Sequence, residues 1–354
     1  MKILAIKPID TGVYKDIFEV FCEGLEKYHG HEVIRVPYIY AQNKIYAWKE
    51  FDQQKLEGAD MVWSPFEPLL PVAFNLKKEY DVPVVGHFEV IPKDINLYTV
   101  EQYWTNHIYE YPLYKAAKYV DYKYFGDLYM KCDAKTYLDE YTMFLIERLV
   151  GLRIDRKKTF IQPYPFDNEM MGKFRDENIK EKRQIISTFR LVDYKRAQHV
   201  IKALSLMDNP PKYVIVGKGV YKDKIVNIAN ELNVEVEFVG EVSDELKAKH
   251  IQESMLSVYP WAWIPIAESS FFKKPAIVYD VPDTHNKMRE MPIYTRNNDI
   301  KELSNIIEHY VNNDKERLDA GKKAFKELSE GRTDILFQKE ACNVLNNIFE
   351  EAKK

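Results

Sequence analysis

The stretch QIISTFRLVDYK, residues 184–195, joins a run of β-forming residues to two cations. Residues 184–189 predict a buried strand, and residues 197–207 have the apolar spacing of a helix. Arg190 and Lys195 therefore lie where a strand gives way to a helix, which is where open α/β sheets bind ligands. Arg grips two oxygens at once and Lys acts as a point charge, so this turn is a candidate diphosphate site. The alternative is a pair of solvated surface cations.

Strands and helices continue to alternate after this turn. An apolar run ends in the turn of Gly217 and Gly219, and Ser243 has the side chain of an N-cap for a helix over residues 244–253. We expect strands over residues 213–216, 235–240, 255–259 and 275–279, and further helices over residues 221–232, 300–310, 315–329 and 337–352. This alternation is typical of a parallel sheet covered by helices.

The first half of the chain has the same alternation. We expect strands over residues 2–7, 32–36, 61–64 and 82–86, a last strand with its exit turn over residues 160–167, and helices over residues 16–28 and 70–79. Residues 98–152 read as mostly helical. The polar run 173–183 is a candidate linker. The sequence thus predicts two α/β domains, which a length of 354 residues also favours.

Composition argues against several classes of protein. A net charge of −4 without a long basic run argues against a nucleic-acid partner. Cys22, Cys132 and Cys342 lack metal-ligand spacing and are expected to be reduced, buried thiols. The N-terminal apolar run is too short for a signal peptide and no 18-residue apolar stretch occurs, so we expect a cytoplasmic protein.

Five short signals follow one another in the second half of the chain. They are Arg-Leu-x-x-x-Lys at residues 190–195, the glycine turn at residues 217–219, the turn at residues 240–245, Tyr-Pro at residues 259–260 and Pro-x-x-Glu at residues 265–268. In this order they resemble the donor-binding half of the family 4 retaining glycosyltransferases, the glycosyl transferases group 1. The resemblance extends from about residue 180 to the C-terminus and is much looser before it.

The resemblance implies an α/β protein of GT-B fold, in which two Rossmann-like domains with parallel sheets face a cleft. Residues 1–172 would form the acceptor-side domain, residues 173–183 the linker and residues 184–332 the domain that binds the nucleotide sugar. The last helix, within residues 333–354, would cross back and pack on the first domain.

The same resemblance implies that a sugar moves from a UDP-, GDP- or ADP-linked donor to a hydroxyl, with retention of configuration, as in hexosyltransferases. The acceptor would be a glycan, a lipid-linked molecule or a small molecule. No cofactor besides the nucleotide-sugar co-substrate is expected. No metal is expected either, because the chain has no Asp-x-Asp motif and GT-B enzymes rely on protein cations.

By this resemblance Arg190 and Lys195 clamp the donor diphosphate, and Glu268 accepts hydrogen bonds from the ribose hydroxyls. An acid in the first turn of a helix is also common for dipole reasons alone. Backbone near Glu241 and Val242 would hold the nucleotide base. The remaining donor-binding residues would be Gly217, Gly219, Ile266, Ser269 and Gly12, of which Gly12 matches the family's glycine loop only partly and also suits a simple turn.

Two residues that follow the strand over residues 82–86 are candidates for contact with the donor sugar. Glu89 falls at the position of a family histidine without a gap, and His87 does so with a shift of two residues. Either would contact sugar hydroxyls or share a proton with the leaving phosphate. The alternative is a satisfied loop histidine and a solvated glutamate.

One departure from the family leaves the function open. Pro260 stands where the family usually carries another glutamate, and Trp261-Ala262-Trp263 replaces its glycine-rich loop. The two indoles suit stacking on a sugar and equally suit closing the core. A non-catalytic GT-B protein that binds nucleotide sugar or glycan is therefore an alternative. A dinucleotide oxidoreductase is the weaker one, because Lys222 stands where its third glycine would fall.

Tyrosine is unevenly spread along the chain. Eleven of the 25 tyrosines lie between Tyr98 and Tyr141. Their rings suit the packing of a helical subdomain, an acceptor groove or a peripheral membrane contact.

Overall fold

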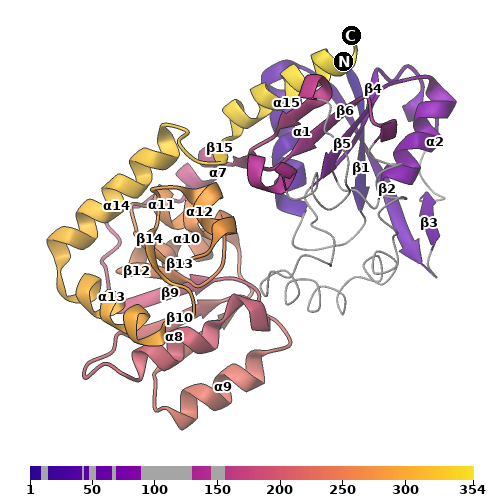
Figure 1. The fold of residues 1–354 in the computed structure, drawn as a ribbon. Helices are drawn as coiled ribbons and strands as arrows, with labels where there is room; N and C mark the ends of the chain where they lie inside the picture. Colours follow the sequence, from indigo (N-terminus) through magenta and orange to yellow (C-terminus); the bar gives the residue numbers. More distant parts are fainter. Residues whose placement is uncertain (9–14, 42–43, 48–52, 66–68, 89–129, 145–155) are drawn as a thin grey trace. The chain divides into compact units, whose positions relative to one another are not determined.

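The computed structural model describes residues 1–8, 15–41, 44–47, 53–65, 69–88, 130–144 and 156–354. By its contacts the chain divides into two units (Figure 1). The first unit consists of Met1–Pro165 and Gln338–Lys354, and the second consists of Phe166–Phe337. Each unit holds its own largely parallel sheet, as the alternation of strands and helices predicts.

The sheet of the first unit has the order β3-β2-β1-β4-β5-β6-β7. β1 pairs in parallel with β2 on one side and with β4 on the other, so Leu4 lies between Ile34 and Val62. Among the strands that the structure describes in this sheet, only β3 runs antiparallel, at the edge beside β2. The strands are β1 (Lys2–Pro8), β2 (Glu32–Ala41), β3 (Lys44–Ala47), β4 (Met61–Ser64), β5 (Val84–Phe88), β6 (Ala134–Tyr137) and β7 (Thr159–Ile161).

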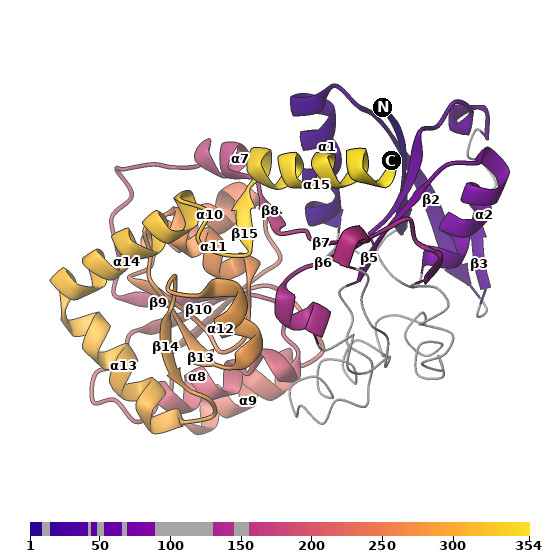
Figure 2. The same cartoon turned by 45° about the horizontal axis from the view of Figure 1, so that its top comes forward.

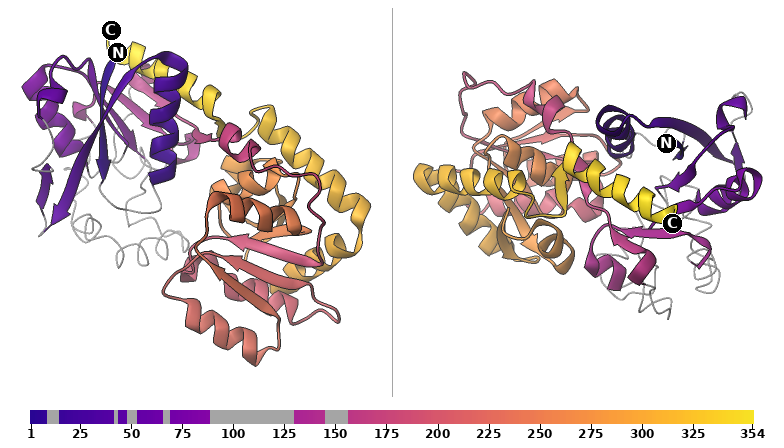
Figure 3. Two further views of the ribbon diagram at one scale, coloured as in Figure 1. Left: turned by 180° about the vertical axis from the view of Figure 1, so that it is seen from behind. Right: turned by 90° about the horizontal axis from the view of Figure 1, so that it is seen from above.

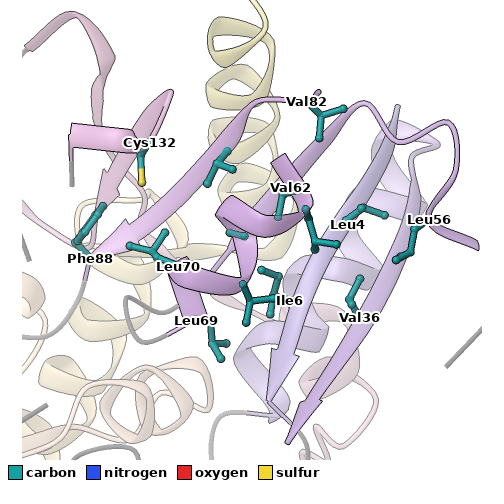
Figure 4. Close-up of a cluster of buried hydrophobic side chains, with 14 of the residues drawn as sticks. Leu4, Ile6, Val36, Leu56, Val62, Leu69, Leu70, Val82, Phe88 and Cys132 are labelled. Atoms are coloured by element: carbon teal, nitrogen blue, oxygen red, sulfur yellow. The ribbon is translucent and has the colours of Figure 1, made fainter. Parts of the chain in front are cut away.

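One face of this sheet packs on α2 (Leu70–Tyr80) and the residue before it (Figure 4). Leu4 and Ile6 of β1 meet Leu69 and Leu70 in a cluster whose members are almost wholly buried. Burial of one such aliphatic side chain contributes about 1.5–3 kcal/mol to stability. The apolar run of β1, from Ile3 to Ile6, is fully buried, as expected of a central strand that is covered on both faces.

The opposite face is covered by α1 (Lys15–His29) and α15 (Gln338–Ala352), which lie side by side (Figure 2). Trp63 of β4 packs edge-on against Phe21 of α1, with ring centroids 5.6 Å apart, and against Phe349 of α15, at 6.1 Å. The last helix therefore belongs to the first unit, which confirms the prediction that it crosses back.

Strand β6 lies in a stretch that the sequence reads as mostly helical, of which the structure describes residues 130–144. All four residues of β6 are buried, and the strand pairs with β5 and β7. Lys135 and Thr136 break the apolar pattern that marks a strand, so the pattern does not reveal it. Inside the unit Nζ of Lys135 donates to the Cys132 carbonyl at 3.1 Å, which offsets part of the cost of burying the ammonium.

The sheet of the second unit has the order β11-β10-β9-β12-β13-β14, and all its pairs are parallel. From β9 the chain moves outward to β10 and β11, then returns to β12 on the other side of β9. The strands are β9 (Gln184–Thr188), β10 (Lys212–Val216), β11 (Val236–Gly240), β12 (Leu256–Tyr259), β13 (Ala276–Asp280) and β14 (Ile293–Arg296). Strand β14 was not predicted from the sequence.

Helices cover both faces of this second sheet (Figure 3). On one face α8 contacts α9 and α13, and on the other α11 contacts α14. The helices are α7 (Asn168–Gly172), α8 (Ala197–Leu204), α9 (Lys222–Glu231), α10 (Asp244–Glu253), α11 (Ile264–Phe271), α12 (Pro282–Met288), α13 (Ile300–Asn312) and α14 (Asp314–Ser329). The Ser243 side chain caps α10 by accepting from the Leu246 amide, as predicted.

The polar run 173–183 lies within the second unit. The Asp176 amide donates to Oε1 of Gln252 at 2.9 Å, and the Lys182 amide donates to the Glu253 carbonyl at 2.7 Å. The remaining elements are β8 (Tyr164–Phe166), which pairs with β15 (Ile335–Phe337), and the short 3₁₀ turns η1 (Gln53–Leu56), η3 (Arg156–Lys158) and η4 (Asp193–Lys195). No helix in the described part of the chain has the length and apolar character needed to cross a membrane.

The close contact of α1 with α15 predicts that the stability of the protein depends on one glycine. A Cβ on Gly24 would lie 2.4 Å from Sγ of Cys342 and 3.1 Å from Cγ of Gln338. Gly24→Ala should lower the free energy of unfolding by about 1–3 kcal/mol, because overpacking outweighs the better helix propensity of Ala. Urea denaturation measures this loss.

A double-mutant cycle provides the control. In a Cys342→Ala background the obstructing sulfur is gone, so Gly24→Ala should cost less by about 1–2 kcal/mol than in the wild type. Equal costs in both backgrounds would mean that the two helices do not meet at this pair.

Candidate functional site

The loops that follow β9 and β10 lie in direct backbone contact. The Leu191 amide donates to the Lys218 carbonyl at 2.9 Å. A Cβ on Gly217 would lie 2.1 Å from the Phe189 carbonyl oxygen, and one on Gly219 would lie 2.3 Å from that of Leu191. Gly217 also has a φ of 137°, which L side chains rarely adopt. The fold itself therefore requires both glycines, because a Cβ at either position would prevent the loops after β9 and β10 from approaching so closely.

The loop after β9 also meets the loop after β12. Nζ of Lys195 donates to the Trp261 carbonyl at 3.1 Å. The same ammonium lies 5.1 Å from the ring centroid of Tyr194 and 5.8 Å from that of Trp261. Because the chain leaves β9 and β12 toward opposite sides of the sheet, this junction is the topological switch point at which open α/β sheets bind ligands.

Arg190 contacts the same tyrosine. Its Nη2 donates to the Tyr194 hydroxyl at 3.3 Å, and the Tyr194 ring packs edge-on against Trp261 with centroids 5.0 Å apart. The structure thus brings both sequence-predicted cations, Arg190 and Lys195, to one phenol at the carboxyl end of β9.

Arg196 is a residue of this turn that the sequence analysis missed. It precedes α8 as the N-cap residue with a φ of 55°, and its side chain is buried. Nη1 donates to Oδ1 of Asn297 at 2.7 Å, and the guanidinium lies 5.7 Å from the Tyr279 ring centroid. These contacts offset the left-handed backbone and fix the turn that ends with Lys195. Both partners lie far along the chain, so no local pattern reveals them.

Glu268, the predicted ribose acceptor, is buried on α11 and paired with a lysine. Oε1 of Glu268 lies 2.8 Å from Nζ of Lys247 on α10, and that ammonium also lies 2.7 Å from Oδ1 of Asp244. Burial opposes the charge of Lys247, but the carboxylates of Glu268 and Asp244 more than offset it and raise its pKa. Lys247 is a second residue that the sequence analysis did not single out.

Two other predicted donor residues of α11 have buried side chains. Oγ of Ser269 lies 2.7 Å from Oγ of Ser257 and 3.0 Å from the Tyr259 hydroxyl, inside the unit. The Ile266 side chain is fully buried, and its amide donates to the Trp263 carbonyl. Their predicted contact with the donor stays a prediction, and the hydroxyl of Ser269 is already engaged.

The turn after β11 carries the predicted base-binding residues. Gly240 ends β11 with a φ of 83°, and its carbonyl accepts from the Gly217 amide at 2.7 Å. Glu241 is exposed and forms an ion pair with Lys218 of the glycine turn, while Val242 is half-buried. The exits of β10 and β11 are thus joined, and the backbone of Glu241 and Val242 lies next to the glycine turn.

The two indoles after β12 differ in burial. Trp261 is almost wholly buried and Trp263 is half-buried, with ring centroids 6.5 Å apart in an edge-on arrangement. Nζ of Lys287 lies 4.4 Å from the Trp263 ring centroid. Trp261 therefore closes the core under Lys195, and Trp263 is the indole that keeps an exposed part.

His87 lies on β5 in the first unit, one residue before the strand ends, and is buried. Its Nδ1 lies 2.8 Å from Oγ1 of Thr136 on β6, and Nε2 has no hydrogen-bond partner among the residues that the structure describes. Burial lowers the pKa of His87 to about 4, although the carboxylate of Asp139 works in the opposite direction. The ring is therefore neutral at neutral pH.

Some predicted site residues lie outside the described residues. These are Gly12, Glu89 and most of the tyrosines between residues 98 and 141. In the described ranges no group of three His, Cys, Asp or Glu side chains is placed to hold a metal ion. Cys22, Cys132 and Cys342 are free and buried, as predicted.

Comparison with known proteins is consistent with this site. Residues 172–327, less than half of the chain, match the family model described as Glycosyl transferases group 1. The matched residues include Arg190, Lys195, Lys247 and Glu268. No curated protein sequence matches the chain at a significant level.

Solved structures match over almost the whole chain. The crystal structure of Anabaena Alr3699/HepE in complex with UDP gives a TM-score of 0.72 at 13% identity, over 99% of this chain and 100% of that one. The chain has the GT-B fold. Two further similar structures are a sucrose-phosphate synthase from Thermosynechococcus elongatus (TM-score 0.71, 12% identity, 99% of this chain and 98% of that one) and a trehalose-6-phosphate structure from E. coli bound with UDP-2-fluoro glucose (TM-score 0.70, 10% identity, 99% of each chain). The GT-B fold predicted from the sequence is thereby confirmed.

The glycine turn of this GT-B protein generates the first prediction about the site. Gly217→Ala should lower the free energy of unfolding by about 3 kcal/mol, because the new Cβ meets the Phe189 carbonyl and the backbone conformation is strained. Gly240→Ala is the matched control, since Gly240 also has a positive φ but has open space around it. It should cost only about 1 kcal/mol. Equal losses in denaturant titrations of the two variants would contradict the close contact of the loops.

Neutral His87 predicts a pH dependence of stability. An unfolded His titrates near pH 6.5, whereas folded His87 binds its proton only near pH 4. The contribution of His87 to the free energy of unfolding should therefore be fully present above pH 6.5. It should fall by at most about 3 kcal/mol as the pH drops toward 4. His87→Gln should remove this part of the slope and leave the similar contribution of His199, whose pKa burial also lowers to about 4. Parallel slopes in the two proteins would contradict a neutral His87.

Proposed function

We propose that this protein is a glycosyltransferase that takes its sugar from a nucleotide-diphosphate donor, with UDP the first nucleotide to test. The observation that carries the proposal is the junction of Arg190, Lys195 and the Trp261 carbonyl at the switch point of the second sheet. The group 1 family match over residues 172–327 and the UDP-bound GT-B structures of similar fold support it.

The chemistry follows from where negative charge builds up. Breaking the bond between sugar and phosphate leaves charge on the departing diphosphate, and fixed cations stabilise that charge in the transition state. The Arg190 guanidinium can bind two phosphate oxygens and the Lys195 ammonium adds a point charge. Glu268 would accept the ribose hydroxyls, and the backbone of Glu241 and Val242 would hold the base.

The finer features belong to the same proposal. We expect transfer to a hydroxyl of a glycan, lipid-linked or small-molecule acceptor, of hexosyl type, with retention of configuration and without a metal. Nε2 of His87 would accept a hydrogen bond from a sugar hydroxyl or donate one to it. The neutral ring is unsuited to protonate the leaving phosphate at neutral pH. A cytoplasmic location is consistent with three free cysteines.

Replacing the clamp residues tests the proposal. Arg190→Ala and Lys195→Ala should each lower kcat/KM for sugar transfer or donor hydrolysis by about 100-fold or more, because each removes a cation from the leaving group. Lys202→Ala is the matched control, since Lys202 is exposed on α8 of the same unit, and should leave the rate unchanged. Near-normal rates in both clamp variants, with normal folding by circular dichroism, would contradict the assignment.

The alternative is a GT-B protein that binds nucleotide sugar without turning it over. Pro260 favours it, because a proline stands where the family usually carries a sugar-reading glutamate. Binding of a UDP-sugar by calorimetry without any UDP release over a long single-turnover incubation would support this alternative. Slow release of UDP in the absence of an acceptor would exclude it.

A further inference from the structure

Lys247 forms an ion pair with Glu268, the carboxylate that the proposed function assigns to the ribose of the nucleotide. It occupies the first turns of α10, and Glu268 lies on α11, so two separate elements bring the pair together. The Glu268 side chain is 11% exposed, and its only charged partner among the described residues is Lys247, 2.8 Å from Oε1. A carboxylate buried to this degree is costly without such a partner.

The two carboxylate oxygens of Glu268 have different surroundings. Lys247 occupies Oε1, and no residue that the structure describes is bonded to Oε2. Oε2 is not among the buried polar atoms that lack a partner, so it is accessible to solvent. A carboxylate whose one oxygen is fixed by an ammonium presents its other oxygen in a defined direction.

Asp244 fixes the lysine in turn. Nζ of Lys247 lies 2.7 Å from Oδ1 of Asp244, one turn earlier on α10, and the Lys247 side chain is only 22% exposed. The ammonium is thus held between an outer carboxylate and an inner one, and has little freedom to leave Glu268. Burial raises the pKa of the Tyr259 phenol, and the charge of Glu268 adds to this effect.

We propose that Lys247 is a positioning residue for nucleotide recognition: it holds Glu268 oriented so that Oε2 accepts a ribose hydroxyl of the nucleotide diphosphate. This inference rests on the proposed function. Lys247 acts through Glu268 and does not itself touch the nucleotide, so its effect depends on the presence of the ribose hydroxyls.

The test compares a nucleotide with its 2′,3′-dideoxy counterpart by calorimetry. UDP, GDP and ADP are first titrated into the wild-type protein, and the one that binds is used with its dideoxy form. Wild type should bind the dideoxy form about 10-fold or more weaker, because a hydrogen bond to a charged group is lost. Lys247→Met should weaken the normal nucleotide about 10-fold and the dideoxy form less than threefold.

Three variants complete the design. Lys247→Arg keeps the charge, so it should keep most of the discrimination and also covers the case in which Lys247→Met does not fold. Lys249→Met is the matched control, because Lys249 is an exposed lysine on the same helix, and it should change neither affinity. In a Glu268→Gln background, Lys247→Met should have no further effect on the ratio of the two affinities.

The outcomes separate the inference from the proposed function. If Lys247→Met weakens both nucleotides equally, or weakens neither, or if Lys247→Arg loses the discrimination in a folded protein, the positioning role is wrong while nucleotide binding stands. If none of the three nucleotides binds the wild-type protein, the proposed function is wrong and the inference fails with it.

Discussion

The candidate site depends on one constraint of the backbone: the loops after β9 and β10 approach too closely to admit a Cβ. Gly217 and Gly219 make this approach possible, and their neighbours are the carbonyls of Phe189 and Leu191. The contact fixes the path of the chain between β9 and α8, which carries Arg190. A sheet with ordinary side chains at these two positions would hold the same strands but would displace the loop that carries the cations.

The charges around this loop are satisfied by protein partners from distant elements. Lys195 donates to the Trp261 carbonyl, Arg196 donates to Asn297, and Lys247 pairs with Glu268. Each contact joins elements that follow different strands of the sheet. Buried or half-buried charges are costly unless they are paired, so each contact holds its cation in place. Cations that are already fixed reduce the reorganisation that a bound diphosphate would require.

Local sequence pattern predicts most of the fold. The strand over residues 61–64 and the helix over residues 244–253 have the predicted bounds, because a short apolar run and an N-cap are local signals. β6 was missed because its buried Lys135 and Thr136 resemble surface residues. That α15 crosses back to the first unit was predicted only from the family resemblance. The apolar stripe of a helix shows that one face is buried, but not which surface covers it.

Site residues could be predicted from the sequence only where a charged side chain stands at a recognisable strand exit or helix start. Arg190, Lys195 and Glu268 stand out as ionic side chains at strand exits and a helix start. Arg196 and Lys247 do not, because their roles come from partners 101 and 21 residues away. Conversely, Ser269 of α11 looks available in the sequence, whereas its Oγ is bonded within the core.

The central claim is that the switch point between β9 and β12 holds a nucleotide diphosphate. A crystal structure of the protein with bound UDP tests it most directly. The account predicts that phosphate oxygens lie within about 4 Å of both the Arg190 guanidinium and the Lys195 ammonium, with the ribose hydroxyls on Glu268. UDP bound elsewhere on the chain, with these side chains making no contact to it, would contradict the account.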